Sequence, residues 1–377
     1  MISLLLSRVE AGGLERVQFT LAHAFRERGE CIEIVAGRVV TSSGAASEVH
    51  CIAPRGAWQF LLRLPFWMRK RRPALVVTTS NDVAVWVLLC RRLLAPDVSV
   101  VVTQHQAVSG PSRAAGGLRR LRLEAMRSLM RVAYPAADAI IAVSEGVALD
   151  MRVELGLGEG RVRVIHNPIV GPLHDPRGLR VLPRPAKWPF PLDGTPVVIF
   201  VGRLSAEKRI DLLLSAFLQV KATRPVRLLI VGEGGLADFA GEWAQEHALA
   251  QDFQMVGRVD DALPWIQHSD VLALPSDYEG FGNVLVEAMQ CGTQIVATDC
   301  PSGPAEILCH GKYGQLVPVG NSNALAAALT ASLDGSFHVE TEELLRRAAD
   351  FSIDRAVDAY AQVFNRLRGS RGRASRC

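Results

Sequence analysis

The sequence lacks a long apolar run, paired cysteines and a recognisable leader segment. In its 377 residues no apolar stretch approaches the roughly 18–20 residues that a membrane-spanning helix needs. The apolar start, Met1–Leu6, has no basic segment before it and is soon followed by Arg8, so we interpret it as a strand, not a signal peptide. The seven cysteines are scattered, with no C-x-x-C pair and no metal-ligand spacing. These absences predict a cytoplasmic protein with reduced cysteines.

The charge of the chain is unevenly divided. The net charge is +4, but residues 1–190 hold 26 Lys/Arg and 15 Asp/Glu, whereas residues 191–377 hold 16 and 23. The first half is therefore basic, and we expect its partner to be anionic. The length, with 49% apolar and 21% charged residues, suits two globular domains.

Strand-like and helix-like stretches alternate along both halves. The expected strands are 2–7, 31–36, 48–52, 74–78, 98–103, 138–143 and 162–165, then 197–201, 226–231, 253–256, 270–274, 294–298 and 315–318. The expected helices are 14–28, 57–72, 83–94, 117–134 and 146–155, then 207–220, 236–249, 260–268, 284–291, 303–308, 321–333, 340–350 and 354–368. This alternation predicts two doubly wound parallel sheets. Ligands of such sheets bind at the carboxyl ends of the strands.

Two carboxylates stand eight residues apart in one segment, Glu279 and Glu287. The apolar run Val271–Leu274 precedes them, and a glycine-flanked turn and the start of an apolar helix lie between them. The backbone N–H groups from Phe281 to Leu285 at such a helix start would suit a phosphate-bearing ligand. A carboxylate can accept hydrogen bonds from two neighbouring hydroxyls, which suits a sugar ring or a ribose.

This segment resembles the E-x7-E signature of retaining glycosyltransferases with the GT-B fold, and is most similar to glycosyltransferase family 4. Other elements in the family's order support the resemblance: Gly12–Arg16, Val143–Glu145, His166–Pro168, Val201–Lys208 (the G-R-x4-K element) and Cys291–Thr298. The resemblance covers most of residues 1–370 and thins over 37–95 and 168–195.

The resemblance implies an α/β GT-B fold, in which two Rossmann-like doubly wound parallel-sheet domains face each other across a cleft. We expect an acceptor-binding domain over 1–167, a Pro-rich linker or short elaboration over 168–196 and a nucleotide-sugar domain over 197–350. A helix over 351–368 should pack back on the first domain. The basic tail, 369–377, should be disordered.

The resemblance also implies donor-binding residues. They are Gly12, Gly13, Gly202, Gly232, Arg258, Gly280, Phe281, Gly282, Asn283, Val284, Leu285 and Glu287. Gly12 and Gly13 would let the backbone approach a ligand closely. The neighbouring Glu15 and Arg16 are equally consistent with a solvated first helical turn. Gly232–Gly235 mimics a dinucleotide fingerprint with a misplaced third glycine, so we interpret it as a donor-side loop rather than an NAD site.

Arg203 and Lys208 are expected to act in catalysis. Fixed cations beside a leaving diphosphate stabilise the transition state more than the ground state; an isolated pair of this kind would more often be a solvated surface pair. The chain has no D-x-D, the carboxylate motif with which metal-dependent sugar-nucleotide transferases hold a divalent ion. We therefore expect no metal and no cofactor, with cations and helix N–H groups taking that role.

Two histidines follow expected strands. A lone histidine is more often structural, but His105 matches the family's histidine in place, and we expect it to contact the transferred sugar rather than to abstract a proton. Glu279 is expected to face the same sugar. We interpret His166 as structural, with Asn167 and Pro168 as a turn.

Two basic amphipathic stretches lie in the first half. Arg120, Arg127 and Arg131 fall within roughly 40° of one another around a helix, and the aromatic stretch Trp58–Trp67 precedes Arg69–Arg72. Both are typical of peripheral attachment to an anionic membrane on its cytoplasmic face. The alternative is two core-facing helices with solvated basic faces. Nucleic acid is not expected, because no motif or stacking aromatics accompany the charge.

The predicted reaction is transfer of a hexose or N-acetylhexosamine, with retention, from a nucleoside diphosphate sugar. UDP is the favoured nucleotide, and the expected acceptor is a lipid-linked or cell-surface glycan. Two alternatives remain open: a non-hydrolysing sugar-nucleotide epimerase of the same fold, and a non-catalytic glycosyltransferase-like binding subunit. The sugar, the base and the acceptor cannot be read from the residues.

Overall fold

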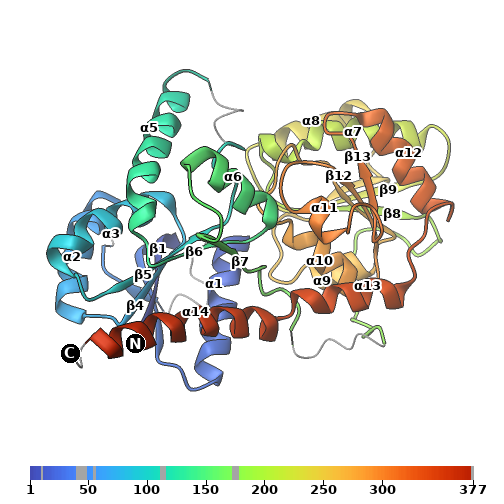
Figure 1. The fold of residues 1–377 in the computed structure, drawn as a ribbon. Coiled ribbons are helices and arrows are strands. Elements are labelled where there is room, and N and C mark those ends of the chain that lie inside the picture. Colours follow the sequence, from blue (N-terminus) through green and yellow to red (C-terminus); the bar gives the residue numbers. More distant parts are fainter. Residues whose placement is uncertain (10–11, 40–48, 54–56, 111–115, 172–177, 375–377) are drawn as a thin grey trace. The chain divides into compact units, whose positions relative to one another are not determined.

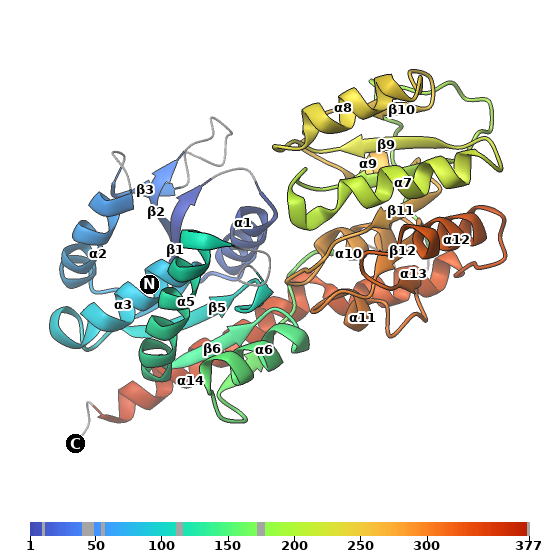
Figure 2. The same ribbon diagram turned by 90° about the horizontal axis from the view of Figure 1, so that it is seen from above.

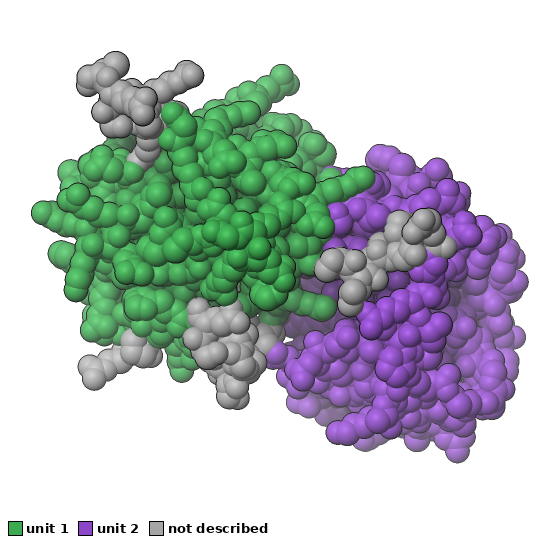
Figure 3. All heavy atoms as spheres, turned by 90° about the horizontal axis from the view of Figure 1, so that it is seen from below, with its two compact units in different colours: residues 1–168, 353–377 green, residues 169–352 purple. Residues whose placement is uncertain are grey.

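The computed structural model describes the chain except for residues 10–11, 40–48, 54–56, 111–115, 172–177 and 375–377. The chain divides into two compact units, coloured separately in Figure 3. Unit 1 comprises Met1–Pro168 and Ile353–Cys377, and unit 2 comprises Ile169–Ser352. Each unit has its own parallel sheet, so the predicted α/β architecture is confirmed.

Unit 1 is built on a seven-stranded sheet with the order β3-β2-β1-β4-β5-β6-β7, of which Figure 1 labels β1, β4, β5, β6 and β7. Its strands are β1 (Ile2–Val9), β2 (Ile32–Val39), β3 (Val49–Cys51), β4 (Leu75–Thr78), β5 (Ser99–Gln104), β6 (Ala139–Ala142) and β7 (Val162–Val164). Every neighbouring pair is parallel. Central strands such as β4 and β5 are buried along their whole length. Their centres, 75–77 and 100–102, are continuous apolar runs, as expected when helices cover both faces of a parallel sheet.

Helices connect these strands. They are α1 (Gly13–Glu27), α2 (Ala57–Arg71), α3 (Asn81–Leu94), α5 (Gly117–Ala133) and α6 (Glu145–Leu155). Helix α6 shows why its ends fall where they do. The Ser144 side chain accepts a hydrogen bond from the Val147 N–H at the start, and Gly156 adopts a left-handed conformation (φ 66°) at the end. Helices α2, α3 and α5 contact one another in that order (Figure 2).

The last helix, α14 (Ile353–Ala374), returns to unit 1. Phe364 packs against Phe25 of α1 with ring centroids 5.4 Å apart. Arg28 pairs with Asp354 and Asp358, and Arg368 binds Glu30 through both carboxylate oxygens. The expectation of a disordered tail from residue 369 was wrong as far as Ala374, because the backbone remains helical to that point. Two of the six residues 369–374 are glycines, which do not favour helix, but they extend a helix that has already formed, and no proline ends it.

Unit 2 is built on a six-stranded parallel sheet with the order β10-β9-β8-β11-β12-β13. Its strands are β8 (Val197–Val201), β9 (Arg227–Val231), β10 (Phe253–Met255), β11 (Val271–Leu274), β12 (Gln294–Thr298) and β13 (Gln315–Val317). Its α-helices are α7 (Ile210–Lys221), α8 (Ala237–Glu246), α9 (Leu263–Gln267), α10 (Asn283–Gln290), α11 (Pro304–Ile307), α12 (Ser322–Leu333) and α13 (Thr341–Ala348).

One hydrophobic core of unit 2 follows from strand alternation. Alternate residues such as Val198 and Phe200 on β8, and Leu228 and Ile230 on β9, point to the same face of the sheet. They pack there against apolar side chains of α7, α8 and α12. The carboxyl ends of all six strands therefore meet along one supported edge.

Two predicted elements differ from the structure. The helix expected over 207–220 is broken, because Ala206–Lys208 forms a short 3₁₀ turn and Arg209 takes a left-handed conformation (φ 48°) before α7 begins. Ion pairs from Arg209 to Asp211 and Asp277 stabilise this break. The described part of the Pro-rich segment belongs to unit 2 from Ile169 onwards and is not a free linker.

Aromatic packing explains the placement of the Pro-rich segment. Trp188 stacks on Trp265 of α9, with ring centroids 6.0 Å apart, and makes an edge contact with Phe190. The Leu182 carbonyl lies 3.0 Å from Nε2 of His268. Proline sets the backbone of the segment but does not prevent its aromatic side chains from docking.

Candidate active site

The loops that follow β8, β9 and β10 are joined by backbone hydrogen bonds at the carboxyl edge of unit 2. Gly202 N–H donates to the Val231 carbonyl at 3.0 Å, and Leu204 N–H donates to the Glu233 carbonyl at 2.9 Å. Gly232 N–H donates to the Gly257 carbonyl at 2.8 Å. Three loops distant in sequence thus form one layer over the strand ends.

The glycines of this layer are required by its packing. A Cβ atom at Gly232 would lie 1.8 Å from the Gly202 carbonyl oxygen, and one at Gly234 would lie 2.3 Å from the Leu204 oxygen. Both residues also have positive φ angles, 148° and 156°. Neighbouring Gly235 has open space around it. The G-x-G pattern at 232–234 is therefore explained by loop packing without a dinucleotide.

Glu279 and Lys208 are brought together although 71 residues separate them. The Lys208 ammonium donates to Oε1 of Glu279 at 2.5 Å, and the Ser276 hydroxyl donates to the same oxygen at 2.7 Å. The Ser276 carbonyl in turn accepts from the Thr298 hydroxyl at 2.5 Å. Glu279 is buried, and its Oε2 has no hydrogen-bond partner within the described chain. The carboxylate is therefore held through Oε1, and Oε2 can accept a hydrogen bond from a ligand.

The buried thiol of Cys300 lies near this pair. Burial, and then the negative charge of Glu279, raise the pKa of Cys300 to about 12, so it stays protonated. It carries no reactive thiolate.

The second carboxylate, Glu287, lies on α10. This helix begins at Asn283, directly after Gly282, whose φ of 96° makes the sharp entry to the helix possible. Glu287 is buried, and its charge contributes to raising the pKa of the neighbouring Cys291, where burial is the larger cause. The ring of Phe281 packs edge-on against Phe351, with centroids 5.5 Å apart, which anchors the turn.

The remaining predicted cations of unit 2 are exposed. The guanidinium groups of Arg203, two residues after β8, and Arg258, after β10, make no hydrogen bond or ion pair with the residues that the structure describes. Both follow carboxyl ends of strands. They remain available for an anionic ligand, whereas Lys208 already gives one of its three N–H groups to Glu279.

In unit 1, His105 directly follows β5. It is partly buried, and its Nε2 lies 3.2 Å from the Thr103 hydroxyl and 3.4 Å from Nε2 of Gln18. Burial lowers the pKa of His105 to about 4, so the imidazole is neutral at physiological pH. Gln18 on α1 is fully buried, and its Oε1 has no partner among the described residues. Sequence reasoning missed Gln18 and Thr103; a glutamine on the buried face of α1 was the available signal.

Gly12 precedes α1 in an extended conformation, and Gly13 begins this helix. A Cβ atom at Gly12 would approach only the end of the flexible Glu15 side chain, at 2.8 Å. Packing within the protein therefore gives no strong reason for glycine at position 12. The predicted ligand-binding role of this loop remains a prediction.

Two family models match the chain, one to each sheet. The model for "Glycosyltransferase Family 4" matches residues 11–170, and the model for "Glycosyl transferases group 1" matches residues 186–350. The chain belongs to these glycosyltransferase families. The predicted family is confirmed.

Curated relatives in the glycosyltransferase families cover part of the chain. A glycogen synthase of Mycobacterium tuberculosis is 29% identical over 280 residues, covering 71% of this chain and 63% of the relative. An N-acetylgalactosaminyltransferase of Campylobacter jejuni that acts on a diphospho-undecaprenol glycan is 27% identical over 206 residues, covering 55% of this chain and 53% of the relative. The chain thus spans between half and two thirds of the length of these relatives.

The fold extends over nearly the whole chain. A solved structure of Anabaena HepE in complex with UDP-glucose superposes with a TM-score of 0.74 at 19% identity, covering 97% of this chain and 99% of the other. The glycosyltransferase fold is therefore GT-B, as predicted.

The prediction of an arginine face on α5 is only partly confirmed. Arg120 is exposed, but Arg127 is bound by Glu124 and by Glu154 of α6, and Nε of Arg131 donates to the Glu154 carbonyl at 2.6 Å. Arg127 is therefore not available to a partner. The exposed arginines of α5 are Arg119, Arg120, Arg122 and Arg131.

Apolar side chains accompany these arginines at the surface. On α2, Trp58, Leu62 and Phe66 are each more than half exposed and recur every four residues, while Phe60, Leu64 and Met68 are buried. On α5, the exposed apolar residues are Leu118, Leu121, Leu129 and Val132, and on the intervening α3 they are Leu89 and Leu93. Helices α2 and α5 thus each have a buried apolar side as well as exposed apolar residues, and the membrane interpretation stays a prediction. We call the exposed arginines of α5 together with the exposed apolar residues of α2, α3 and α5 the α2–α5 surface. No helix in the described chain is both long and apolar enough to span a bilayer.

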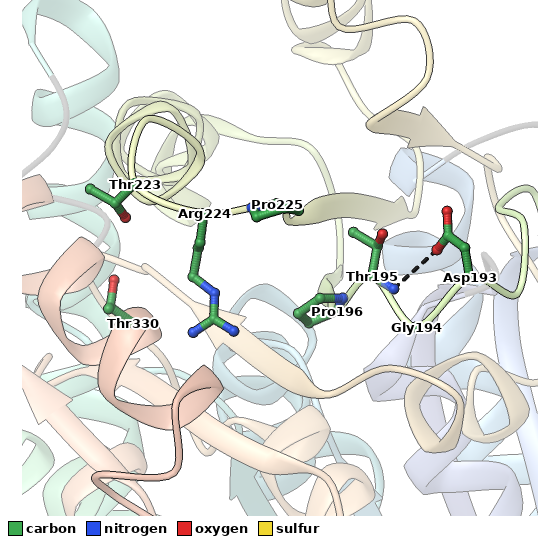
Figure 4. A pocket seen from close by; sticks show the side chains of 8 residues that line it. All are labelled: Asp193, Gly194, Thr195, Pro196, Thr223, Arg224, Pro225 and Thr330. Atoms are coloured by element: carbon green, nitrogen blue, oxygen red, sulfur yellow. Dashed lines mark hydrogen bonds between the residues drawn. The ribbon is translucent and has the colours of Figure 1, made fainter.

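A separate cavity of about 600 Å³ lies away from the predicted site (Figure 4). Its lining residues are Asp193, Gly194, Thr195, Pro196, Thr223, Arg224, Pro225 and Thr330. Several of them immediately precede β8 and β9, so the cavity lies at the amino edge of the sheet, opposite the motif loops. None of the predicted site residues lines it.

Proposed function

We propose that the protein is a retaining glycosyltransferase that transfers a hexose or N-acetylhexosamine from a nucleoside diphosphate sugar, with UDP favoured. The observation that carries the proposal is the Lys208–Glu279–Ser276 cluster beside the start of α10. It puts a cation, and a carboxylate with one oxygen still free to accept, at the carboxyl ends of the strands, where ligands of such sheets bind. The likeness to a UDP-glucose complex supports the choice of UDP.

Each group has a defined role in this proposal. Only one Lys208 N–H is used by Glu279, so the others remain for phosphate oxygens. Arg203 and Arg258 add exposed guanidinium groups, and the start of α10 adds its backbone dipole. Oε2 of Glu279 accepts from sugar hydroxyls, Glu287 accepts from the ribose, and His105 contacts the transferred sugar.

The reaction then needs no enzyme nucleophile. An acceptor hydroxyl attacks the anomeric carbon on the face of the leaving group, and the bond from that carbon to the diphosphate breaks. The departing phosphate oxygen takes the acceptor's proton. The cations stabilise the charge that grows on the diphosphate. We propose that no metal takes part, because the sequence has no D-x-D motif and the cations can neutralise the diphosphate instead.

We further propose a glycan on a lipid-linked carrier as the acceptor, and attachment of unit 1 to an anionic membrane surface through the α2–α5 surface. The diphospho-undecaprenol relative supports such an acceptor. Exposed tryptophan, phenylalanine and leucine beside arginines suit the interface of an anionic leaflet.

The test is incubation with a panel of nucleotide sugars, with and without membrane lipid extract and with excess EDTA. Release of free nucleoside diphosphate that depends on the extract and survives EDTA supports the proposal. Conversion of the nucleotide sugar without acceptor would indicate the epimerase alternative. Binding without turnover under every condition would indicate a non-catalytic subunit, and loss of turnover in EDTA would contradict metal independence.

A further inference from the structure

A short hydrogen-bond chain runs from the backbone of β4 to the imidazole of His105. The Thr103 hydroxyl donates to the Thr78 carbonyl at 2.9 Å. Its oxygen lies 3.2 Å from Nε2 of His105. Thr78 and Thr103 are buried on neighbouring strands of the sheet. The core therefore fixes this end of the hydrogen-bond chain.

The number of protons available along this hydrogen-bond chain determines the tautomer of His105. A hydroxyl has a single proton, and Thr103 uses it on the Thr78 carbonyl. Its oxygen can therefore only accept from the imidazole, which requires a proton on Nε2 of His105. Because a neutral imidazole carries one N–H, Nδ1 is then left as an acceptor.

Gln18 approaches the same nitrogen but less closely. Its amide nitrogen lies 3.4 Å from Nε2, against 3.2 Å for the Thr103 oxygen. The Gln18 amide could donate a hydrogen bond only to an unprotonated Nε2. The Thr103 oxygen would then face the lone pair of Nε2 with no proton between them. The buried oxygen of the Gln18 amide otherwise lacks a partner in the described chain. If the amide is rotated by 180°, this oxygen can accept the Nε2 proton.

The acceptor on Nδ1 has no protein partner. No hydrogen bond to Nδ1 exists among the residues that the structure describes. A neutral imidazole with a bare Nδ1 attracts a hydroxyl, which donates, and does not attract a carboxylate, which at neutral pH only accepts. Burial keeps the imidazole neutral, because it lowers the pKa of His105 to about 4.

We propose that Thr103 is a positioning residue that holds His105 as the Nε2–H tautomer, so that Nδ1 accepts from a hydroxyl group of the transferred sugar. The site then takes a sugar that presents a hydroxyl to Nδ1 and disfavours one that presents a carboxylate at that position. The sugar contact rests on the proposed function, whereas the tautomer does not.

The first experiment reads the tautomer without any substrate. Two-bond ¹H–¹⁵N correlation spectra of ¹⁵N-labelled protein at pH 7.5, with His105 assigned by its loss in His105→Gln, should show a proton on Nε2. Thr103→Ser keeps the hydroxyl and should keep this pattern. Thr103→Val keeps the shape but lacks the acceptor. The Gln18 amide can then turn its N–H₂ group towards a bare Nε2, so this variant should populate the Nδ1–H form. An Nδ1–H imidazole in the wild type, or an unchanged pattern in Thr103→Val, overturns the proposal.

The second experiment separates the tautomer from the glycosyl transfer. Thr103→Val should lower turnover of a UDP-hexose by about three- to tenfold, the effect of one hydrogen bond, and Thr103→Ser should restore it. Binding of free UDP, measured by calorimetry, should be the same in all three proteins. Turnover of a UDP-hexose that is unchanged in Thr103→Val would contradict the contact between Nδ1 and the sugar. Absence of turnover with every donor would reject the proposed function while the spectra still decide the tautomer.

Discussion

The two units differ in charge and in what they present at their surfaces. Unit 1 contains 28 Lys/Arg and 16 Asp/Glu, a net charge of +12, whereas unit 2 contains 14 and 22, a net charge of −8. Acidic unit 2 nevertheless contains the predicted phosphate-binding cations. Its loops are joined by backbone hydrogen bonds, and its key carboxylates are buried. The proposed diphosphate site thus depends on the local arrangement of a few groups and not on the net charge of the unit.

Basic unit 1 presents a broad surface instead. Exposed arginines and exposed large apolar residues share α2, α3 and α5, whereas Arg127, in the middle of the same helix α5, is neutralised by Glu124 and Glu154. Such a surface suits an extended partner rather than a small ligand. Substitutions in each unit can test whether this division of roles holds.

The largest expected effect is on turnover when the cations of unit 2 are removed. Arg203→Ala and Lys208→Ala should each lower kcat/KM about 10²–10³-fold, because a charge-assisted contact to the leaving diphosphate contributes about 2–4 kcal/mol in a closed site. The control is Arg346→Ala, which removes an exposed cation of the same unit. Rates within a few-fold of wild type for both variants would contradict the assignment.

The next effect concerns membrane attachment of unit 1. Reversing charge at Arg119, Arg120 and Arg122 should weaken binding to anionic vesicles about 100-fold or more, since each basic residue contributes about 1 kcal/mol at such a surface. Reversal at Lys312, Arg346 and Arg366, which are also exposed, changes the net charge equally and is the matched control. Flotation at several salt concentrations gives the affinities.

The two contributions of the α2–α5 surface can be separated. Replacing Trp58 and Phe66 by serine should weaken vesicle binding without changing its salt dependence, because apolar burial is not screened. Equal losses for the arginine triple variant and its control would mean that only net charge acts, and absence of binding to vesicles at low salt would reject the membrane proposal.

A neighbouring pair of glycines tests the layer of loops in unit 2. Gly232→Ala should destabilise this unit by about 2–3 kcal/mol or more, because the new Cβ meets the Gly202 carbonyl and the residue has a positive φ. Gly235→Ala, three residues away, has open space and should be nearly neutral. Denaturant unfolding followed by tryptophan fluorescence compares them, and similar stabilities would show that the loops are not packed as described.

The two carboxylates should differ in ligand binding. Glu287→Ala should weaken binding of free UDP about tenfold, the effect of a hydrogen bond to a charged group, because Glu287 is expected to hold the ribose. Glu279→Ala should leave UDP binding nearly intact and lower turnover, since its open oxygen is expected to face the sugar. Calorimetry with UDP distinguishes the two, and equal losses would contradict the separate roles.

The smallest expected effect is the pH dependence of stability from His105. The pKa of His105 is about 4 in the folded protein against 6.5 for an ordinary histidine, so between these values the unfolded chain binds more protons. The free energy of unfolding therefore falls as the pH drops from 6.5 towards 4. His105→Gln should reduce this fall by about 1–2 kcal/mol, measured by urea unfolding at pH 7 and pH 5. An identical pH dependence in both proteins would mean that His105 is not held neutral by burial.

The sequence by itself determined the strands, most helices, the family and the positions of the motif loops. Buried parallel strands are continuous apolar runs, and glycines mark their ends, so local composition carried this information. The carboxylate segment and the G-R-x4-K element could be located from the residues alone, because each occupies one stretch of chain.

Only the tertiary structure decided which of these residues meet. It paired Lys208 with Glu279 and Arg127 with Glu154, stacked Trp188 on Trp265 and placed Gln18 beside His105. It also showed that Trp58 and Phe66 are exposed, although the helical periodicity of the sequence is equally consistent with a core position for both. Local periodicity shows which side chains share a face, but the partner of that face depends on contacts between segments tens to hundreds of residues apart, which one sequence does not encode in any local pattern.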